Sequence, residues 1–329
     1  MRKEIIITLI LLLVPIFIIF SLLYAGIGRY FYGVSIDPNV AKPFIEKKES
    51  EEDTKKREKE LAWIKEKAEE REIESTKNGN LKLHAYRIKA EKESNIWVIA
   101  LHGYMSDGTK MVTYAQKFYE KGYNVLLPDL RGHGKSEGDY IGMGWHDRLD
   151  IIDWINYLNR EYPDCKIALF GVSMGAATVM MTTGEDLPKN VVVAVEDCGY
   201  TSVWDEFKYQ LKRIYHLPAF PVLNAGNKSC KKYAGYTFKE ASAIEQVKKS
   251  DIPTLFIHGD EDDFVPYEML DELYKAADCE KSKLVIEGAG HGKAASKNPE
   301  LYWNTVYAFI NKYTTINETT ENTAEVLNS

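Results

Sequence analysis

Short apolar runs, separated by stretches with helical spacing, constrain the fold of this chain most strongly. The stretches with helical spacing include TKMVTYAQKFYEKG and WHDRLDIIDWINYLNREY. The compact apolar runs between which they lie are typical of strands buried on both faces. The alternation predicts an α/β fold with a mostly parallel central sheet and helices on both faces. The compact runs are IWVIALHG, YNVLLPD, KIALFG, VVVAVED, TLFIHGD and KLVIEGAG, and they are preceded by LKLHAYRIK, which alternates apolar and polar residues.

Residues 81–313 carry this pattern without an internal repeat or a low-complexity segment, so we expect one domain there. An aromatic-rich insertion, residues 200–249, breaks the alternation. An insertion of this length over one end of a sheet is expected to be a helical lid lining a binding cleft. The alternative is an ordinary helical excursion with a small core of its own. The polar tail, residues 314–329, is predicted to be disordered.

The first 33 residues are predicted to form a membrane anchor. Residues 5–28 contain no charged side chain, and as a helix these 24 residues span about 36 Å, more than the roughly 30 Å of a bilayer's hydrocarbon core. Tyr24, Tyr30 and Tyr32 suit the aromatic interface at the far end of such a helix. The alternative is a cleaved signal peptide, which the length of the run and the poor cleavage triplet at residues 23–25 disfavour.

The charges flanking the apolar run do not choose an orientation. Arg2 and Lys3 precede it, and Arg29 and three lysines before residue 50 follow it. A short N-terminal tail and a long following domain favour a signal anchor with its N-terminus inside. The expectation is therefore a single-pass protein of the cell membrane with an extracytoplasmic domain.

Residues 34–80 are predicted to be a linker and a charged juxtamembrane helix. Residues 46–74 hold 9 Lys or Arg against 12 Asp or Glu, with Leu61, Ile64 and Ala68 at helical spacing. A solvated spacer helix, or one that packs on the domain, is the expected role. The alternative, a coiled-coil partner site, lacks enough heptads.

Charge and cysteine content exclude other classes. The formal net charge of -7 argues against a nucleic-acid partner, because counterion release from a phosphate backbone needs a basic face. Cys165, Cys198, Cys230 and Cys279 are too far apart for a CxxC metal or redox motif. Buried free thiols are the simplest interpretation, and a bond between Cys198 and Cys230 stays open. No metal or cofactor is expected, and the oligomeric state is not predicted.

Ser173 lies in GVSMG, between a strand and a run of small residues. A serine here is either a helix N-cap or a nucleophile on a sharp strand-to-helix turn. A nucleophilic serine needs a histidine base and usually a carboxylate that orients it. His291 follows the last predicted strand, and the preceding loop, residues 258–266, offers four carboxylates among which composition does not choose.

Acyl transfer also needs preorganised N–H donors for the oxyanion. The loop LHGYMSDG follows a strand at the same end of the sheet and offers the Tyr104 amide. The second donor would be the Met174 amide, directly after the serine.

Five motifs in chain order, LHGYMSDG, PDLRGHGKSEG, FGVSMGAAT, FIHGDEDDFVP and GAGHG, resemble the α/β-hydrolase superfamily over residues 81–313. The chain is most similar to membrane-anchored serine hydrolases related to serine aminopeptidases and monoacylglycerol lipases. The resemblance implies Ser173 as nucleophile, His291 as general base and Asp262 as the orienting acid, with the Tyr104 and Met174 amides as oxyanion donors. It implies structural roles for His102, Asp129, Arg131 and His133.

The function expected on these grounds is hydrolysis of carboxylic esters through an acyl-enzyme. Membrane tethering and the aromatic insertion favour apolar or lipid-like acyl groups. The alternatives are a serine aminopeptidase, an acyl-protein thioesterase, or a binding protein of the same fold that has lost catalysis.

Overall fold

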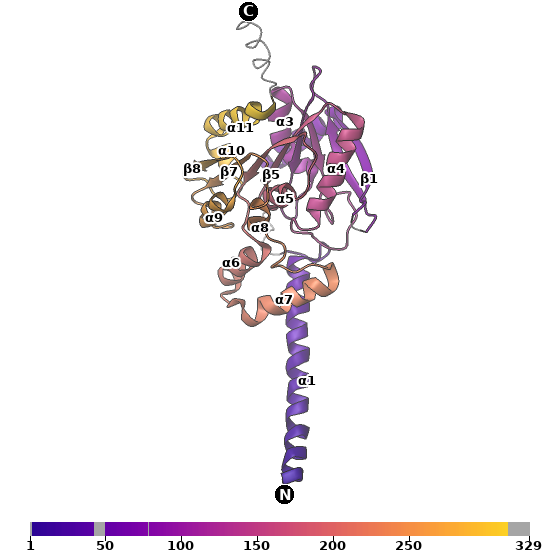
Figure 1. Ribbon diagram of the computed structural model, residues 1–329, viewed down its shortest axis with the longest axis vertical. Coiled ribbons are helices and arrows are strands. Elements are labelled where there is room, and N and C mark those ends of the chain that lie inside the picture. The colour runs from indigo at the N-terminus through magenta and orange to yellow at the C-terminus, as the bar shows by residue number, and fades with distance from the viewer. Residues whose placement is uncertain (1, 43–49, 78, 315–329) are drawn as a thin grey trace, which may run out of the picture.

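The computed structural model describes residues 2–42, 50–77 and 79–314. Its centre is an 8-stranded sheet of order β1-β2-β4-β3-β5-β6-β7-β8 (Figure 1). The first two pairings along this order are antiparallel and the others are parallel, which confirms the predicted mostly parallel sheet. The strands are β1 (Ala68–Glu74), β2 (Lys82–Ile88), β3 (Ile96–Leu101), β4 (Asn124–Pro128), β5 (Lys166–Val172), β6 (Val191–Asp197), β7 (Thr254–Gly259) and β8 (Lys281–Ile286).

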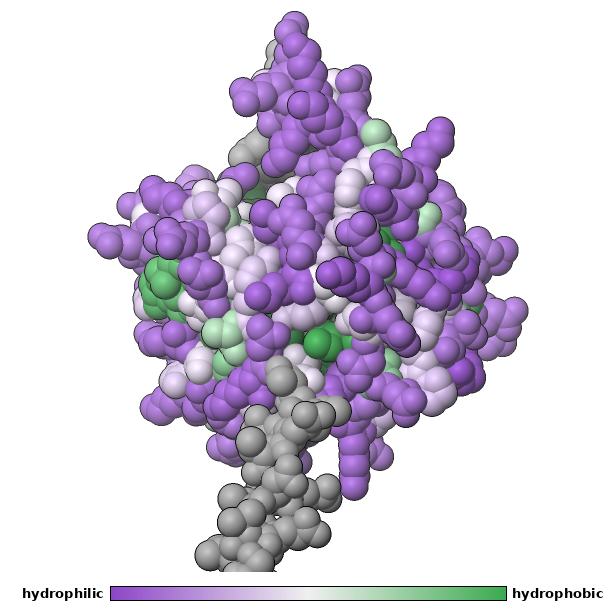
Figure 2. Space-filling model, turned by 90° about the horizontal axis from the view of Figure 1, so that it is seen from above, coloured by the Kyte–Doolittle hydropathy of each residue, from purple (hydrophilic) through white to green (hydrophobic). Residues whose placement is uncertain are grey.

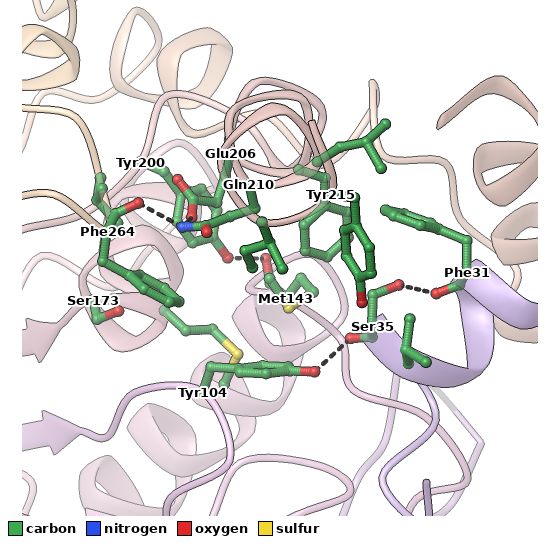
Figure 3. Close-up of a pocket in the computed structure, with 16 residues that line it drawn as sticks. Phe31, Ser35, Tyr104, Met143, Ser173, Tyr200, Glu206, Gln210, Tyr215 and Phe264 are labelled. Carbon is green, nitrogen blue, oxygen red and sulfur yellow. Dashed lines mark hydrogen bonds between the residues drawn. The ribbon is translucent and has the colours of Figure 1, made fainter. Parts of the chain in front are cut away.

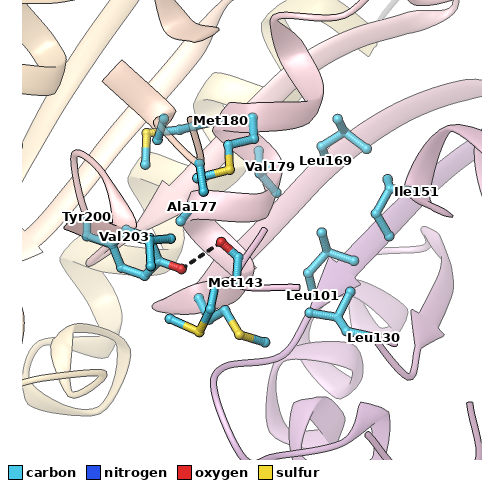
Figure 4. Close-up of a cluster of buried hydrophobic side chains, with 14 of the residues drawn as sticks. Leu101, Leu130, Met143, Ile151, Leu169, Ala177, Val179, Met180, Tyr200 and Val203 are labelled. Atoms are coloured by element: carbon cyan, nitrogen blue, oxygen red, sulfur yellow. Dashed lines mark hydrogen bonds between the residues drawn. The ribbon is translucent and has the colours of Figure 1, made fainter. Parts of the chain in front are cut away.

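Helices cover both faces of the sheet, as two separate hydrophobic clusters show. One cluster joins the sheet to α3 (Val112–Glu120), α10 (Ala294–Lys297) and α11 (Pro299–Thr314). The other joins it to α4 (Asp147–Glu161), α5 (Met174–Thr183), α8 (Ala243–Val247) and α9 (Glu268–Ala276). Helix α5 is buried along its whole length, and Ala177, Val179 and Met180 contribute to the core shown in Figure 4.

The predicted insertion forms α6 (Val203–Tyr215) and α7 (Ala219–Ala234), followed by α8. Ser202 begins α6 by accepting a hydrogen bond from the Asp205 amide, a standard N-cap. In Figure 1, α6 and α7 lie between the sheet and the free length of the N-terminal helix. The insertion therefore separates the sheet from the expected membrane.

The expected charged helix is shorter than the sequence suggested. Helix α2 (Glu51–Lys67) begins with a capping box between Ser50 and Asp53. Residues 68–74, which we expected to continue the charged helix and linker segment, instead form edge strand β1, paired antiparallel with β2. The sheet therefore begins before Leu81. A charged edge strand is physically sensible, because charges on an edge discourage pairing with other chains.

The N-terminal helix α1 (Arg2–Ser35) contains a 29-residue segment, Ile7–Ser35, that is long and apolar enough to cross a membrane. Within this segment, the side chains from Ile7 to Leu23 are exposed apart from the half-buried Ser21, but the last turns of the helix pack on the domain. Phe31 makes edge-to-face contacts with Phe207 of α6 and with Phe238.

Two details at the ends of the chain differ from expectation. Tyr32 was expected at the membrane interface, but it is 4% exposed and packs against Tyr233 of α7. Thr314, expected in the disordered tail, is the buried last residue of α11. The rest of the predicted tail lies outside the described residues.

Candidate functional site

Ser173 occupies a strained turn between β5 and α5. Its φ of 59° lies in the left-handed region, where a non-glycine residue is uncommon. Its amide donates to the Asp197 carbonyl at 2.8 Å, which fixes the turn against β6. The hydroxyl is therefore held at the carboxyl end of the sheet.

The flanking glycines are required by close backbone approaches. A Cβ at Gly175 would lie 2.2 Å from the Leu101 carbonyl oxygen, and one at Gly171 would lie 2.3 Å from the Gly175 carbonyl oxygen. Without side chains at these positions, α5 begins almost against β3 and β5. The small residues thus serve packing and also set the geometry of the serine.

The structure brings Ser173, His291 and Asp262 together from three different loops. His291 Nε2 lies 2.8 Å from Ser173 Oγ, and His291 Nδ1 lies 2.8 Å from Asp262 Oδ2. The geometry fits a tautomer in which Nδ1–H donates to the carboxylate and Nε2 accepts the serine proton. We call residues 258–266 the acid loop. Of its four carboxylates, Asp262 is the one that is hydrogen-bonded to His291.

Asp262 is held in its ionised form. Burial alone would raise its pKa, but hydrogen bonds from His258 and His291 outweigh burial and hold the pKa well below its usual range. The second oxygen, Oδ1, accepts from the amides of Phe264 and Val265, each at 2.9 Å. An acid fixed at both oxygens can orient the imidazole.

The neighbouring acids have other partners. Asp260 accepts a hydrogen bond from the Gly288 amide at 2.6 Å, and Asp263 pairs with Arg213 of α6 at 2.9 Å. Both contacts are on the exposed surface. They stabilise the loop and its contact with α6, away from the imidazole.

Tyr104 and Met174 lie beside Ser173 in the same pocket. A Cβ at Gly103 would lie 3.5 Å from the Ser173 Cβ, so the loop after β3 passes close to the serine. The amides expected to receive an oxyanion are therefore on segments that adjoin the nucleophile.

Two buried histidines support that loop. The Leu130 amide donates to His102 Nε2 at 3.0 Å, and the Met105 amide donates to His133 Nε2 at 3.2 Å. Burial lowers the pKa of His133 to about 3, which keeps it a neutral acceptor. The bonds tie the loop after β3 to the loop after β4, a structural role.

The two charged residues of the loop after β4 are also structural. Asp129 accepts from the Gly108 amide at 2.7 Å, and Arg131 forms a buried ion pair with Asp150 at 2.6 Å. Neither lines the pocket that holds Ser173.

The pocket at Ser173 runs from the serine to the end of α1 (Figure 3). Apolar side chains from α1, α6 and the acid loop line most of it, including Phe31, Leu211 and Phe264. The Tyr104 hydroxyl donates to the Ser35 carbonyl at 2.8 Å, so the loop after β3 is bonded directly to the last turn of α1.

Glu206 and Gln210 of α6 are polar pocket residues that the sequence analysis missed. Gln210 Nε2 donates to Glu206 Oε1 at 2.8 Å and to the Phe264 carbonyl at 2.6 Å. Burial raises the pKa of Glu206 to about 8, so its carboxyl group is protonated at neutral pH. The missed signal was helical spacing, because both residues fall on the face that carries Val203, Phe207 and Leu211.

The cysteines are free thiols, including Cys198 and Cys230, so the bond left open between them is absent from the structure. Ligand atoms of Cys198, Asp262 and His291 lie within 4.8 Å of one another. Burial raises the pKa of the Cys198 thiol well above its ordinary value, whereas a metal ligand would be a thiolate. Within this group, Asp262 and His291 are hydrogen-bonded to each other at 2.8 Å.

A family profile described as serine aminopeptidase, S33, matches residues 92–205, which include the candidate nucleophile Ser173 and the loop after β3 that contains Tyr104. The chain is 28% identical over 225 residues to the uncharacterized protein YqkD of Bacillus subtilis, covering 68% of this chain and 73% of that protein. It is 25% identical over 218 residues to the lysophosphatidylserine lipase ABHD12 of Macaca fascicularis, covering 61% of this chain but only 50% of the lipase.

Solved structures agree with these matches. The Pyrococcus furiosus esterase Pf2001 superposes with a TM-score of 0.62 at 25% identity, covering 77% of this chain and 95% of the esterase. The acylaminoacyl peptidase of Pyrococcus horikoshii shares the fold, with a TM-score of 0.57 at 18% identity over 81% of this chain and 45% of the peptidase. Fold and matches together show that the chain has the α/β-hydrolase fold. Within that superfamily it resembles the S33 serine aminopeptidase group.

Proposed function

We propose that this protein is a membrane-anchored serine hydrolase that cleaves carboxylic esters with apolar acyl groups. The observation that carries the proposal is the continuous hydrogen-bond chain from Ser173 through His291 to Asp262, at one end of an apolar pocket. The similarity to a lipase and to an esterase supports the same reaction class.

In the proposed mechanism, Ser173 Oγ attacks the ester carbonyl carbon while His291 Nε2 takes its proton. Asp262 orients the imidazole and stabilises the imidazolium. The Tyr104 and Met174 amides receive the oxyanion of the tetrahedral intermediate. The intermediate collapses, the C–O bond breaks, and His291 returns the proton to the departing alcohol. Water, activated by His291, then releases the acid and regenerates the serine.

The pocket favours an apolar acyl group. An acyl carbon bound to Ser173 would direct its chain along the apolar walls formed by α6 and the end of α1, and α6 would act as a lid. Glu206, being protonated, is suited to donate a hydrogen bond to a neutral oxygen of the substrate.

Glu206 is also the residue that bears on the alternative of an aminopeptidase. A substrate ammonium group would have to draw the proton off Glu206 before it could pair with the carboxylate, whereas a neutral ester would not. The raised pKa of Glu206 therefore supports the ester over the aminoacyl substrate.

We further propose that α1 is a signal anchor with its N-terminus inside and the hydrolase domain outside the cell. The apolar segment Ile7–Ser35 supports a membrane span. Proteases added to intact cells are expected to degrade the domain only if it faces outward. If the domain is protected in intact cells and degraded after permeabilisation, its orientation is the reverse of the one proposed.

A substrate panel tests the proposed reaction. The purified full-length protein is expected to hydrolyse nitrophenyl esters, with rates that rise from short to medium acyl chains, and Ser173→Ala is expected to be inactive. Cleavage of aminoacyl amides or acyl thioesters without ester hydrolysis would replace the ester proposal with the corresponding alternative. No turnover of any substrate would favour a binding protein.

A further inference from the structure

The packing of α1 on α7 sets the height of the domain above the membrane that α1 is proposed to span. The apolar run begins at Ile5, and 20 residues at 1.5 Å each cross the roughly 30 Å hydrocarbon core, which ends near Tyr24. Helix α7 crosses α1 at Gly28, where an added Cβ would lie 2.5 Å from the Ala225 carbonyl oxygen. Four further residues correspond to about 6 Å, which places α7 at headgroup level.

The α6–α7 region exposes apolar side chains on this side of the domain. Of the seven exposed large hydrophobic residues described after α1, four lie in residues 215–233, and Phe220 is 71% exposed. In Figure 1, α7 and the turn before it form the lower edge of the domain, on the side from which the free length of α1 extends. The opposite side of the molecule is largely hydrophilic (Figure 2). The seven are Leu61, Met105, Tyr215, Leu217, Phe220, Tyr233 and Leu301.

Helix α7 carries charges that suit lipid headgroups. It contains three lysines and no acidic residue. Lys228 and Lys232 line a groove between α7 and α1 together with Phe17, Phe20 and Tyr24. Lysines beside apolar side chains at this level can extend their ammonium groups to phosphates.

The pocket of Ser173 adjoins this surface. Its wall includes Phe31 of α1 and, from the end of α6, Ile214 and Tyr215. Leu217 follows Tyr215 by two residues and is 43% exposed. The apolar path from the serine therefore ends where the exposed turn begins.

We propose that the α6–α7 turn and α7 lie in the headgroup layer of the membrane that α1 spans, and that the ester substrate passes directly from the bilayer into the pocket between α1 and α6. The proposal rests on the proposed function and names its substrate class, an ester of a membrane lipid. Helix α1 then forms a wall of the acyl pocket in addition to anchoring the enzyme.

Depth-dependent quenching tests the membrane contact without requiring activity. Phe220→Cys and Leu301→Cys, in a Cys279→Ser background, are labelled with a small fluorophore and reconstituted in vesicles containing brominated phospholipids. Leu301, on α11, is a matched control because it is also exposed, at 45%. Quenching at position 220 is expected to exceed that at 301 severalfold. Equal quenching at both positions would overturn the proposal.

Activity provides the second measurement. Leu217→Asp combined with Phe220→Asp is expected to slow hydrolysis of a long-chain ester embedded in the same vesicle about tenfold, while a water-soluble short-chain ester is hydrolysed at the wild-type rate. Leu301→Asp should leave both rates unchanged. An unchanged ratio of the two rates in the double variant would contradict access from the bilayer. Failure of the wild type on both esters would instead refute the proposed function, and the quenching result would stand.

Discussion

The turn that holds Ser173 and the region formed by α1, α6 and α7 contribute to one pocket in different ways. The serine turn is set by backbone approaches within the sheet and the start of α5, because small residues let α5 begin against β3 and β5 beside a serine with a positive φ. The α1–α6–α7 region is set by contacts between segments far apart in sequence, such as Phe31 with Phe207 and Phe238. On the proposed function, the sheet fixes the position of the nucleophile, while the packing of α1 against the insertion shapes the pocket that would select the substrate.

The largest expected effect lies on the chemical side of this comparison. Asp262→Asn keeps the size of the side chain but removes the charge that orients and stabilises the protonated His291, so kcat for a nitrophenyl ester should fall by about 10³ to 10⁴. Asp260, on the same loop, accepts a hydrogen bond from the Gly288 amide, so Asp260→Asn should keep near wild-type kcat. Similar losses in both variants would show that the loop, rather than Asp262, is what matters.

A second test concerns the buried carboxyl group of Glu206 on α6. Because burial raises the pKa of Glu206 to about 8, the unfolded state releases the proton at lower pH than the folded state. Below about pH 4.5 the Glu206 carboxyl group is protonated in both states, so it does not change the free energy of unfolding. From there to about pH 8 it lowers the free energy of unfolding by about 1.4 kcal/mol for each pH unit. Glu206→Gln removes that cost and keeps an acceptor for Gln210.

Thermal unfolding of both proteins from pH 5 to pH 8 measures the effect. The Tm of Glu206→Gln relative to the wild type is expected to rise with pH. Parallel curves would mean that Glu206 is ionised in the folded protein, and the argument against an ammonium-binding pocket would fail with it.

The contact between the anchor and the insertion can be tested by two glycines of α1. Gly28→Ala places a methyl group against the Ala225 carbonyl and should lower stability by about 1–3 kcal/mol or shift α7. An added Cβ at Gly26 meets nothing within 4 Å, so Gly26→Ala is the matched control. Equal denaturation midpoints for the two variants in the same detergent would argue against the packing of α1 on α7.

The smallest expected effect distinguishes a residue that lines the acyl pocket from one that takes part in catalysis. Phe31→Ala shortens the wall contributed by α1, so KM for a long-chain ester should rise about tenfold with little change in kcat or in the rate on acetate esters. Tyr30→Ala changes the neighbouring side chain, which is 64% exposed, and should leave the chain-length profile as in the wild type. A loss that is uniform across chain lengths in Phe31→Ala would indicate a general structural role.

The same contrast explains what the sequence could predict. Strand runs and ordered motifs are local, and they predicted the sheet and brought attention to Ser173, Asp262 and His291, which the structure places in hydrogen-bond contact. Edge strand β1 was missed because its charged sequence, AEEREIE, has little of the apolar pattern of the central strands.

The pocket beyond the serine could not be predicted in the same way. Tyr32 has the composition of an interfacial residue, and only the packing of α7 buries it. Glu206 lies on the apolar face of α6, but its environment depends on the acid loop and on α1, which no local pattern contains. Residues whose role depends on contacts between distant segments require the structure.

Covalent labelling tests the central claim most directly. An alkyl fluorophosphonate is expected to modify the wild-type protein at Ser173, identified by mass spectrometry of the peptide, and to leave Ser173→Ala unmodified. Ser296→Ala, which removes an exposed serine that follows His291 in the chain, should label as the wild type does. Equal labelling of Ser173→Ala and the wild type, or modification at another serine, would contradict the assignment of Ser173 as the nucleophile.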